Sequence, residues 1–474
     1  MVLNGLSLTA SLMLPLVLGN LVGGDGLTNS LVDHVNNSLQ DKATLYSLTT
    51  IKTYYVSANT GQDSNNGLSA SSPFKTIQKA ADITNPGDTV LIMNGVYTTT
   101  EGQVLSITRS GTPRAWITYK AYPGHSPQLQ LQNNVWNGIS VQNGASYIEI
   151  NGLEVIGNSV NPIVNLAYAQ SQQSNTSDSL TNNNCISVDG RTGGHPHHIR
   201  ILNNKVHDCG GAGISAIQTD YMTIQGNEVY NNAWYSVYAQ SGISTWQNWR
   251  FDSSTGYKML IRNNKVYNNR QYIPWIAVGK ITDGNGIIID DSRNTQNGST
   301  LGAYTGRTLV ENNIVFNNGG SGIHTYLSDH VDIVNNTAYL NNQSPEITLG
   351  QIFTNTSSDV NILSNILYPI SGKNVNSNWG STNVTFNYNV YGNANSTTIL
   401  VKGNHDIVAN PKFVKASIDA SKANFQLQST SPAINKGFAW TNWTRWINLK
   451  IADTDFAGKP RPSGSEYDIG AYQY

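Results

Sequence analysis

One pattern recurs along the chain from Trp136 onward. A strand that begins Gly-Ile or Cys-Ile is followed by a variable insert, then by a second strand that ends in Asn-Asn or Gly-Asn. Successive copies lie 23 residues (Asn204 to Asn227) to 49 residues (Asn264 to Asn313) apart. Short strands that repeat in this way predict a solenoid of parallel β coils. The first strands are GISVQ (138–142), CISVD (185–189), GISAI (213–217), GISTW (242–246), GIIID (286–290) and GIHTY (322–326).

Two registers of similar residues run through the second strands. Because they recur in every coil, including the poorly matching ones, we interpret both as structural, with buried asparagines bonding to the coils above and below. The asparagine register is Asn204, Asn227, Asn264, Asn313, Asn336, Asn365 and Asn389. The aromatic register lies three residues later, at His207, Tyr230, Tyr267, Phe316, Tyr339 and Tyr368.

The composition excludes several classes of protein. Only 12% of the residues are charged and the net charge is −1, so the chain lacks the basic surface that an electrostatic nucleic-acid binder needs. The 43 glycines and the 38% apolar share are typical of an all-β chain with many turns rather than of a helical array.

The domain organisation predicted from the sequence has three parts. Residues 1–24 contain the one strongly apolar stretch (8–24), which has the length of a secretory signal core rather than of a membrane span. Residues 25–51 are interpreted as a polar linker and residues 52–474 as one β-solenoid domain, so we expect a secreted monomer with no membrane span in the mature chain. The two cysteines, Cys185 and Cys209, are predicted either to form one bridge or to be buried free thiols.

The ends of the solenoid carry motifs of their own. The opening sequence YYVSANTGQDSNNGLSASSPFKTIQKAAD (54–82) predicts an entering strand, a turn and a short amphipathic helix that caps the open end, and residues 457–462 and 467–472 are predicted to close the other end. With the repeats, these motifs resemble the right-handed parallel β-helix proteins of the pectate-lyase-like superfamily, nearest the branch that contains the family 9 pectate lyases. The resemblance covers residues 52–474 and implies a single-stranded right-handed parallel β-helix. It leaves the reaction open, because that superfamily includes uronan lyases, glycoside hydrolases, epimerases and phage tailspikes.

Strand alternation predicts which first-strand side chains face outward. In each Gly-Ile strand the Ile and the residue two later point into the core, so the residues between and after them point out. The middle of this outward column carries aromatic, acidic and imidazole side chains, and the longest inserts (233–257 and 271–286) are rich in aromatics. Long loops over a rigid scaffold commonly build binding sites, although these rings could also just cover a coil edge. The predicted saccharide-binding residues are Asp189, Trp246, Trp249, Trp275 and Tyr326.

The densest group of ionisable residues lies between Lys280 and Arg293. Asp283, Asp290 and Asp291 together could hold a hard cation such as Ca²⁺ through oxygen ligands, while His324 is predicted to lie near Asp290 on the next coil. The family 9 lyases that the chain resembles have an aspartate-rich calcium site and a lysine base, and the three aspartates and Lys280 match these in type.

Three functions follow from this group, and the first is favoured. In a Ca²⁺-dependent lyase of a uronic-acid polysaccharide, Lys280 would be the base for β-elimination and Arg293 a charge partner, with Arg250, Lys258 and Arg270 as alternatives. In a glycoside hydrolase, an aspartate pair would cleave the bond and His324 would adjust one carboxyl pKa. In a non-catalytic adhesin or tailspike-like protein, the groove would only bind carbohydrate, and Asp-Gly-Asn-Gly (283–286) would be an ordinary turn.

Overall fold

A computed structural model of the chain describes residues 50–159, 169–170, 178–438, 454–462 and 467–474. The chain divides into two compact units, Met1–Thr50 and Ile51–Tyr474. The predicted signal segment (1–24) and all but the last two residues of the predicted linker (25–51) lie outside the described residues. Within the described part, no helix is long and apolar enough to cross a membrane.

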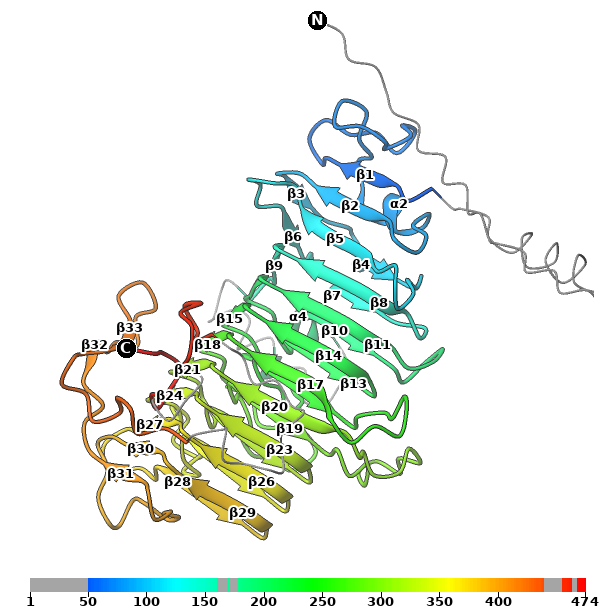
Figure 1. Ribbon diagram of the computed structural model, residues 1–474. Helices are drawn as coiled ribbons and strands as arrows, with labels where there is room; N and C mark the ends of the chain where they lie inside the picture. The colour runs from blue at the N-terminus through cyan, green and yellow to red at the C-terminus, as the bar shows by residue number, and fades with distance from the viewer. Residues whose placement is uncertain (1–49, 160–168, 171–177, 439–453, 463–466) are drawn as a thin grey trace, which may run out of the picture. The chain divides into compact units, whose positions relative to one another are not determined.

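Three parallel sheets form the second unit, and each coil of the chain adds one strand to each sheet in turn (Figure 1). Sheet 1 consists of β4 (Gly102–Ile107), β7 (Val135–Val141), β10 (Asn184–Asp189), β13 (Ile214–Ile217), β16 (Ile243–Trp246), β19 (Ile287–Asp290), β22 (Ile323–Tyr326), β25 (Ile352–Asn355) and β28 (Asn376–Trp379). Sheet 2 consists of β1 (Thr53–Val56), β2 (Thr89–Ile92), β5 (Ile117–Ala121), β8 (Ser146–Asn151), β11 (His197–Leu202), β14 (Asp220–Gln225), β17 (Tyr257–Arg262), β20 (Arg307–Glu311), β23 (Asp329–Val334), β26 (Ser358–Leu363) and β29 (Thr382–Asn387). Sheet 3 consists of β3 (Val96–Tyr97), β6 (Gln128–Gln130), β9 (Glu154–Ile156), β12 (Lys205–His207), β15 (Glu228–Tyr230), β18 (Lys265–Tyr267), β21 (Ile314–Phe316), β24 (Thr337–Tyr339), β27 (Ile366–Tyr368), β30 (Val390–Tyr391) and β31 (Ile407–Val408).

The solenoid predicted from the repeat is therefore confirmed, and so is the direction of its side chains. Ile243, Ile287 and Ile323 are register partners on neighbouring strands of sheet 1 and are fully buried. Adjacent strands of a sheet lie about 4.8 Å apart, so identical inward side chains stack directly on one another along the axis. This stacking fixes the register, because a slip of one residue would turn every apolar side chain outward.

The asparagine register forms a continuous hydrogen-bonded ladder at the turn between sheets 2 and 3. Asn264 shows the repeating arrangement: its backbone N–H and its Nδ2 both donate to Oδ1 of Asn313, at 2.9 and 3.0 Å. The same Nδ2 donates to the carbonyl oxygen of Ile224 at 2.9 Å. Each ladder member thus satisfies backbone groups of a tight, buried turn that water does not reach, which confirms the structural interpretation.

The aromatic register is a stack on the outer side of sheet 3. Ring centroids are 4.6 Å apart between His207 and Tyr230, and 4.9 Å apart between Tyr230 and Tyr267 and between Tyr267 and Phe316. A two-stranded antiparallel sheet, β32 (Phe413–Lys415) and β33 (Asn424–Leu427), covers the stack at Phe316. The ring of Phe425 packs on that of Phe316, with centroids 5.4 Å apart. The rings therefore have a packing role, as predicted.

The two helices of the described chain are short. The predicted N-terminal helix forms over α2 (Ile77–Ala81), whose N-cap Thr76 accepts a hydrogen bond from the Lys79 N–H and whose Ile77, Ala80 and Ala81 are buried. The predicted role of this helix as a cap on the open end of the solenoid is not shown by the described residues. The second helix, α4 (Ser179–Asn182), precedes β10.

Cys185 and Cys209 form a disulfide with a Cα–Cα distance of 5.7 Å, which settles the alternative left open by the sequence. Replacing both residues by Ala is expected to lower the free energy of unfolding by about 3 kcal/mol, because the bridge closes a loop of 24 residues in the unfolded chain. Guanidinium denaturation of the variant and the wild type checks this value. Both cysteines are fully buried, so brief exposure of the native wild type to reductant, removed before denaturation, should leave its midpoint unchanged. Reductant present throughout the titration should lower the midpoint as the double exchange does, because the unfolded chain exposes the bridge, and an unchanged midpoint there would contradict the argument.

Candidate active site

One column of outward side chains follows the last residue of the seven strands of sheet 1 from β10 to β28. In register order the column is Asp189, Ile217, Trp246, Asp290, Tyr326, Asn355 and Trp379, and we call it the sheet 1 strip. All its members are half-buried except Trp379, which is 66% exposed. The neighbouring outward column is much more closed, since Ile288, His324 and Phe353 are all buried. The predicted outward column thus exists, and the strip is its accessible side.

Asp283 lies beside the strip, close enough for its charge to act on Asp290. Each accepts a hydrogen bond from an amide: Asn285 Nδ2 donates to Asp283 Oδ1 at 2.9 Å, and Gln296 Nε2 donates to Asp290 Oδ1 at 3.0 Å. Both side chains retain some contact with solvent. They are therefore set deep in the surface without being sealed from a ligand.

Burial dominates the acidity of both groups. It raises the pKa of Asp283 to about 6, against the opposing hydrogen bonds of Thr282 and Asn285. Burial, and then the charges of Asp283 and Asp291, raise the pKa of Asp290 well above its usual range. Burial and the same three carboxylates also raise the pKa of the Tyr326 hydroxyl. Two neighbouring carboxyls with separated pKa values can divide the roles of proton donor and proton acceptor.

Asp291 has a different role from the other two aspartates. It is fully buried, with a φ of 45° at the end of β19. Its oxygens accept hydrogen bonds from Gln247 Nε2 (3.0 Å), from the Thr295 N–H (2.9 Å) and hydroxyl (3.0 Å), and from the Gln296 N–H (2.8 Å). The carboxylate thus holds the turn that positions Gln296 next to Asp290.

The three predicted calcium ligands do not fit a calcium site. Ca²⁺ takes six to eight oxygen ligands, whereas both oxygens of Asp291 are already engaged by protein donors. Among the residues that the structure describes, no three His, Cys, Asp or Glu side chains are placed to hold a metal ion. We therefore derive no catalytic step through calcium.

The predicted cationic partners lie elsewhere. Arg293 forms a two-pronged ion pair with Asp329, with its Nε 2.9 Å and its Nη2 2.8 Å from the carboxylate oxygens, so it is not a charge partner of Asp290. Lys280 is exposed on a tight hairpin, where its carbonyl accepts from the Trp275 N–H at 2.8 Å. Of the alternatives, Lys258 is buried against Asp220. Within the described chain no ion pair joins Lys280 to the three aspartates.

His324 is a neutral, buried side chain. It is the register partner of Ile288, not of Asp290, and its ring stacks on Phe353 with centroids 4.6 Å apart. Burial lowers its pKa to about 3. An uncharged imidazole adds no charge that could tune Asp290, so this part of the predicted hydrolase site is corrected.

The predicted aromatic residues divide into two groups. Trp246 and Tyr326 lie on the strip as the direct register partners of Asp290 on either side. Trp249 instead stacks on His195, with centroids 4.8 Å apart, and Trp275 begins the hairpin that carries Lys280. Only the first two rings directly flank the carboxyl pair.

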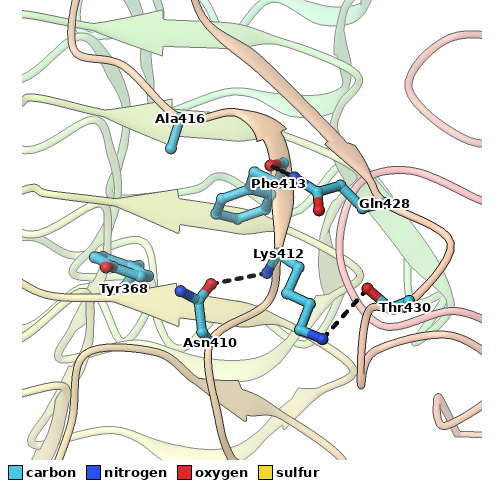
Figure 2. A pocket seen from close by; sticks show the side chains of 7 residues that line it. All are labelled: Tyr368, Asn410, Lys412, Phe413, Ala416, Gln428 and Thr430. Atoms are coloured by element: carbon cyan, nitrogen blue, oxygen red, sulfur yellow. Dashed lines mark hydrogen bonds between the residues drawn. The ribbon is translucent and has the colours of Figure 1, made fainter.

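Hollows in the described surface include a cleft of ≈ 550 Å³ whose lining contains Trp246, Arg191 and the turn 297–301. A second hollow of ≈ 410 Å³ lies between Tyr368 of β27 and the C-terminal segment, where Lys412 Nζ donates to Thr430 Oγ1 at 3.2 Å (Figure 2). No acidic residue lines either hollow. The cleft at Trp246 is the candidate substrate site because Trp246 is the register partner of Asp290 on the neighbouring strand.

The sequence pattern of the Pel9A-like right-handed β-helix region matches residues 54–357, more than half of the chain. The chain belongs to the Pel9A-like family. Right-handed winding, expected from the resemblance, is thereby confirmed. No curated protein sequence matches the chain.

Solved structures similar to this Pel9A-like chain carry several activities in their names. Pectate lyase Pel9A is 17% identical with a TM-score of 0.48, over 90% of this chain and 97% of its own. A rhamnogalacturonan lyase is 16% identical with a TM-score of 0.45, over 80% and 97%. The GH136 lacto-N-biosidase from Eubacterium ramulus is 15% identical with a TM-score of 0.44, over 77% and 59%. Similarity at this level does not identify the reaction of the Pel9A-like chain.

Three residues near the site were missed from the sequence. Gln296 positions Asp290, Arg191 binds Asp189 at 2.6 Å, and Trp379 ends the strip. Trp379 belongs to the strand NSNW, which lacks the Gly-Ile signal of the other coils. One signal was available in the sequence: NSNW comes directly before the weak repeat copy at 384–393. It therefore stands where the first strand of that coil, with its outward side chains, is expected.

Proposed function

We propose that this chain cleaves a polysaccharide by acid–base hydrolysis, with Asp290 and Asp283 as the reacting pair. One observation supports this above the others: two partly accessible carboxyls with raised pKa values lie close enough for the charge of Asp283 to raise the pKa of Asp290, and Asp290 lies between Trp246 and Tyr326 on the strip. Aromatic faces suit sugar rings, and paired carboxyls are the usual groups for glycoside hydrolysis.

We assign the two carboxyls different roles from their surroundings. Asp290, whose pKa is raised by burial and by the charges of Asp283 and Asp291, keeps its proton and donates it to the glycosidic oxygen as the bond to the departing sugar breaks. Asp283, which ionises near pH 6, takes a proton from the attacking water or stabilises the positive charge that develops on the sugar ring. Gln296 and Asn285 hold the two carboxyls in place during this exchange.

β-Elimination is the second candidate, favoured by family membership, since the family's namesake Pel9A is a pectate lyase. It requires a base for the C5 proton and a group that neutralises the uronate. In this chain Lys280 would have to serve as the base from its exposed hairpin. The third candidate is a protein that binds carbohydrate on the same strip without cleaving it. Such a protein would not need the raised pKa values of Asp283 and Asp290.

An activity screen separates the three candidates. Neutral and uronic polysaccharides are incubated with the protein, with Ca²⁺ or with EDTA, while new reducing ends and the ultraviolet absorbance of unsaturated products are followed together. Hydrolysis gives reducing ends without absorbance and is indifferent to EDTA. Absorbance that grows with the reducing ends establishes a lyase and overturns the proposal, and silence across a broad panel favours the binder.

The pH profile of kcat/KM is expected to be bell-shaped. Activity should rise as pH increases through about 6, because Asp283 must lose its proton to act. It should fall at higher pH, where Asp290 loses the proton that it donates. Initial rates across a series of buffers check both limbs, and a profile that is already maximal well below pH 5 would contradict the assignment of Asp283.

We also propose that the protein works outside the cell as a monomer. The Cys185–Cys209 bridge supports this location, because disulfides persist mainly in oxidising compartments. The apolar stretch at 8–24 is consistent with export. Detection of the chain in culture medium, with size-exclusion chromatography of the native protein, tests both points.

A further inference from the structure

The sheet 1 strip carries two carboxyls, Asp189 and Asp290, and Asp283 adjoins it. Arg191 is paired with Asp189, its Nε 3.0 Å and its Nη2 2.6 Å from the two oxygens. Arg293 is likewise committed to Asp329. Among the residues that the structure describes, no cation forms an ion pair with Asp283 or Asp290, and the nearest in sequence, Lys280, is exposed on its hairpin. The strip itself is therefore neutral when Asp290 is protonated and negative when it is ionised.

Other groups report the same negative potential. The hydroxyl of Tyr326 has its pKa raised by burial and by the charges of Asp290, Asp291 and Asp283. Charges separated by less than about 8 Å are only partly screened at physiological salt. A polyanionic chain lying here would bring a carboxylate close to these groups every one or two sugars, and like charges across an interface oppose binding.

Aromatic side chains recur on every second coil of the strip from β16 to β28. Trp246 lies on β16, Tyr326 on β22 and Trp379 on β28, with Asp290 and Asn355 on the strands between them. With strands about 4.8 Å apart, successive rings are about 10 Å apart along the axis. This spacing is close to the length of two sugars in an extended β-linked glycan. Trp379, 66% exposed, has no packing reason to be a tryptophan.

We propose that the sheet 1 strip binds an uncharged, extended glycan along the axis of the solenoid, with one aromatic ring for each disaccharide, at Trp246, Tyr326 and Trp379. The inference rests on the proposed function in that it places the substrate across Asp283 and Asp290. It goes further in excluding a polyuronate as the preferred substrate and in giving Trp379 a binding role two coils beyond Tyr326.

Binding of hexasaccharides to the full chain tests the proposal. An array of neutral probes, including cellohexaose, xylohexaose and mannohexaose, is compared with hexagalacturonate by calorimetry at low and high salt. We expect at least one neutral probe to bind with an affinity indifferent to salt, and hexagalacturonate to bind at least about tenfold more weakly at low salt. Tighter binding of hexagalacturonate, or no binding of any neutral probe, overturns the proposal.

Two variants make the test specific. Trp379→Ala should weaken binding of the best neutral hexasaccharide by about tenfold while leaving its trisaccharide unaffected, because the short probe does not reach the third ring. Trp136→Ala, which removes a 39% exposed Trp outside the strip, is the matched control. If Trp379→Ala and Trp136→Ala weaken hexasaccharide binding equally, Trp379 has no specific role in binding.

The charge argument has its own variant. The double variant Asp283→Asn/Asp290→Asn should bind hexagalacturonate more tightly than the wild type at low salt, with neutral probes changed by less than about threefold. No gain for hexagalacturonate overturns the electrostatic basis of the inference. This variant also separates the two proposals, because it is expected to bind without cleaving. If it binds a neutral probe while the wild type releases no reducing ends, the hydrolase proposal fails and the binding proposal stands.

Discussion

The Asp290→Asn variant is expected to lose about 10²–10⁴-fold in kcat on its polysaccharide substrate while remaining folded. Asparagine keeps the shape of the side chain and can still accept from Gln296 Nε2, which lies 3.0 Å from Oδ1 in the wild type. What it cannot do is give a proton to the glycosidic oxygen. The loss should therefore fall on kcat and not on the melting temperature, measured in parallel by circular dichroism.

Aryl glycosides separate the roles of the two aspartates. The conjugate base of a phenol with a low pKa leaves without needing a proton from the enzyme. Asp290→Asn should therefore keep most of its activity on an aryl glycoside of such a phenol. Asp283→Asn should lose activity on both the aryl glycoside and the polysaccharide. Asp419→Asn is the control, because that carboxylate accepts from Lys422 and Ser421 on the C-terminal segment. If Asp290→Asn retains more than about a tenth of wild-type activity on the polysaccharide, Asp290 is not the acid.

The fold could be predicted because its information is local and repeated. The coils from β10 to β22 show a Gly-Ile or Cys-Ile strand followed by the repeated Asn, so a single alignment gives the register that the structure shows from Ile186 to Ile323. A second buried ladder, Asn232, Asn269, Asn318 and Asn341, was not predicted. It repeats five residues after the first, but asparagine is so common in this sequence that the second register did not stand out.

The candidate site was predictable only where strand geometry decides it. Alternation places Asp290 and Tyr326 outward, and the structure agrees. Asp291, the next residue, was grouped with them as a ligand, but its φ of 45° turns the chain and directs the side chain to the donors of the following turn. The partner of Arg293 lies 36 residues away on the next coil, and such pairings depend on three-dimensional proximity that the spacing of charges does not reveal.

Asn264→Ala is expected to lower the free energy of unfolding by about 3–6 kcal/mol, the largest stability effect of any single exchange that we predict. Asn264 is fully buried, and its Oδ1 accepts from both the backbone N–H and Nδ2 of Asn227 at 3.0 Å. Removing the amide leaves the Asn227 N–H and Nδ2 without the oxygen that accepts from them, and the Ile224 carbonyl oxygen loses the donor at 2.9 Å. Each buried polar group left unsatisfied costs about 1–3 kcal/mol, and the cavity adds to this.

The position in the solenoid increases the effect of this exchange. Coils of a repeat protein are stabilised by their immediate neighbours, and Asn264 joins the coil of Asn227 to that of Asn313, so its loss weakens two interfaces. Asn59→Ala, which removes an exposed amide bonded to the Asn94 carbonyl at 3.4 Å, is the control and should cost less than about 0.5 kcal/mol. Guanidinium denaturation measures the free energy of unfolding of both variants. If their values differ by less than about 1 kcal/mol, the asparagine ladder does not contribute measurably to stability.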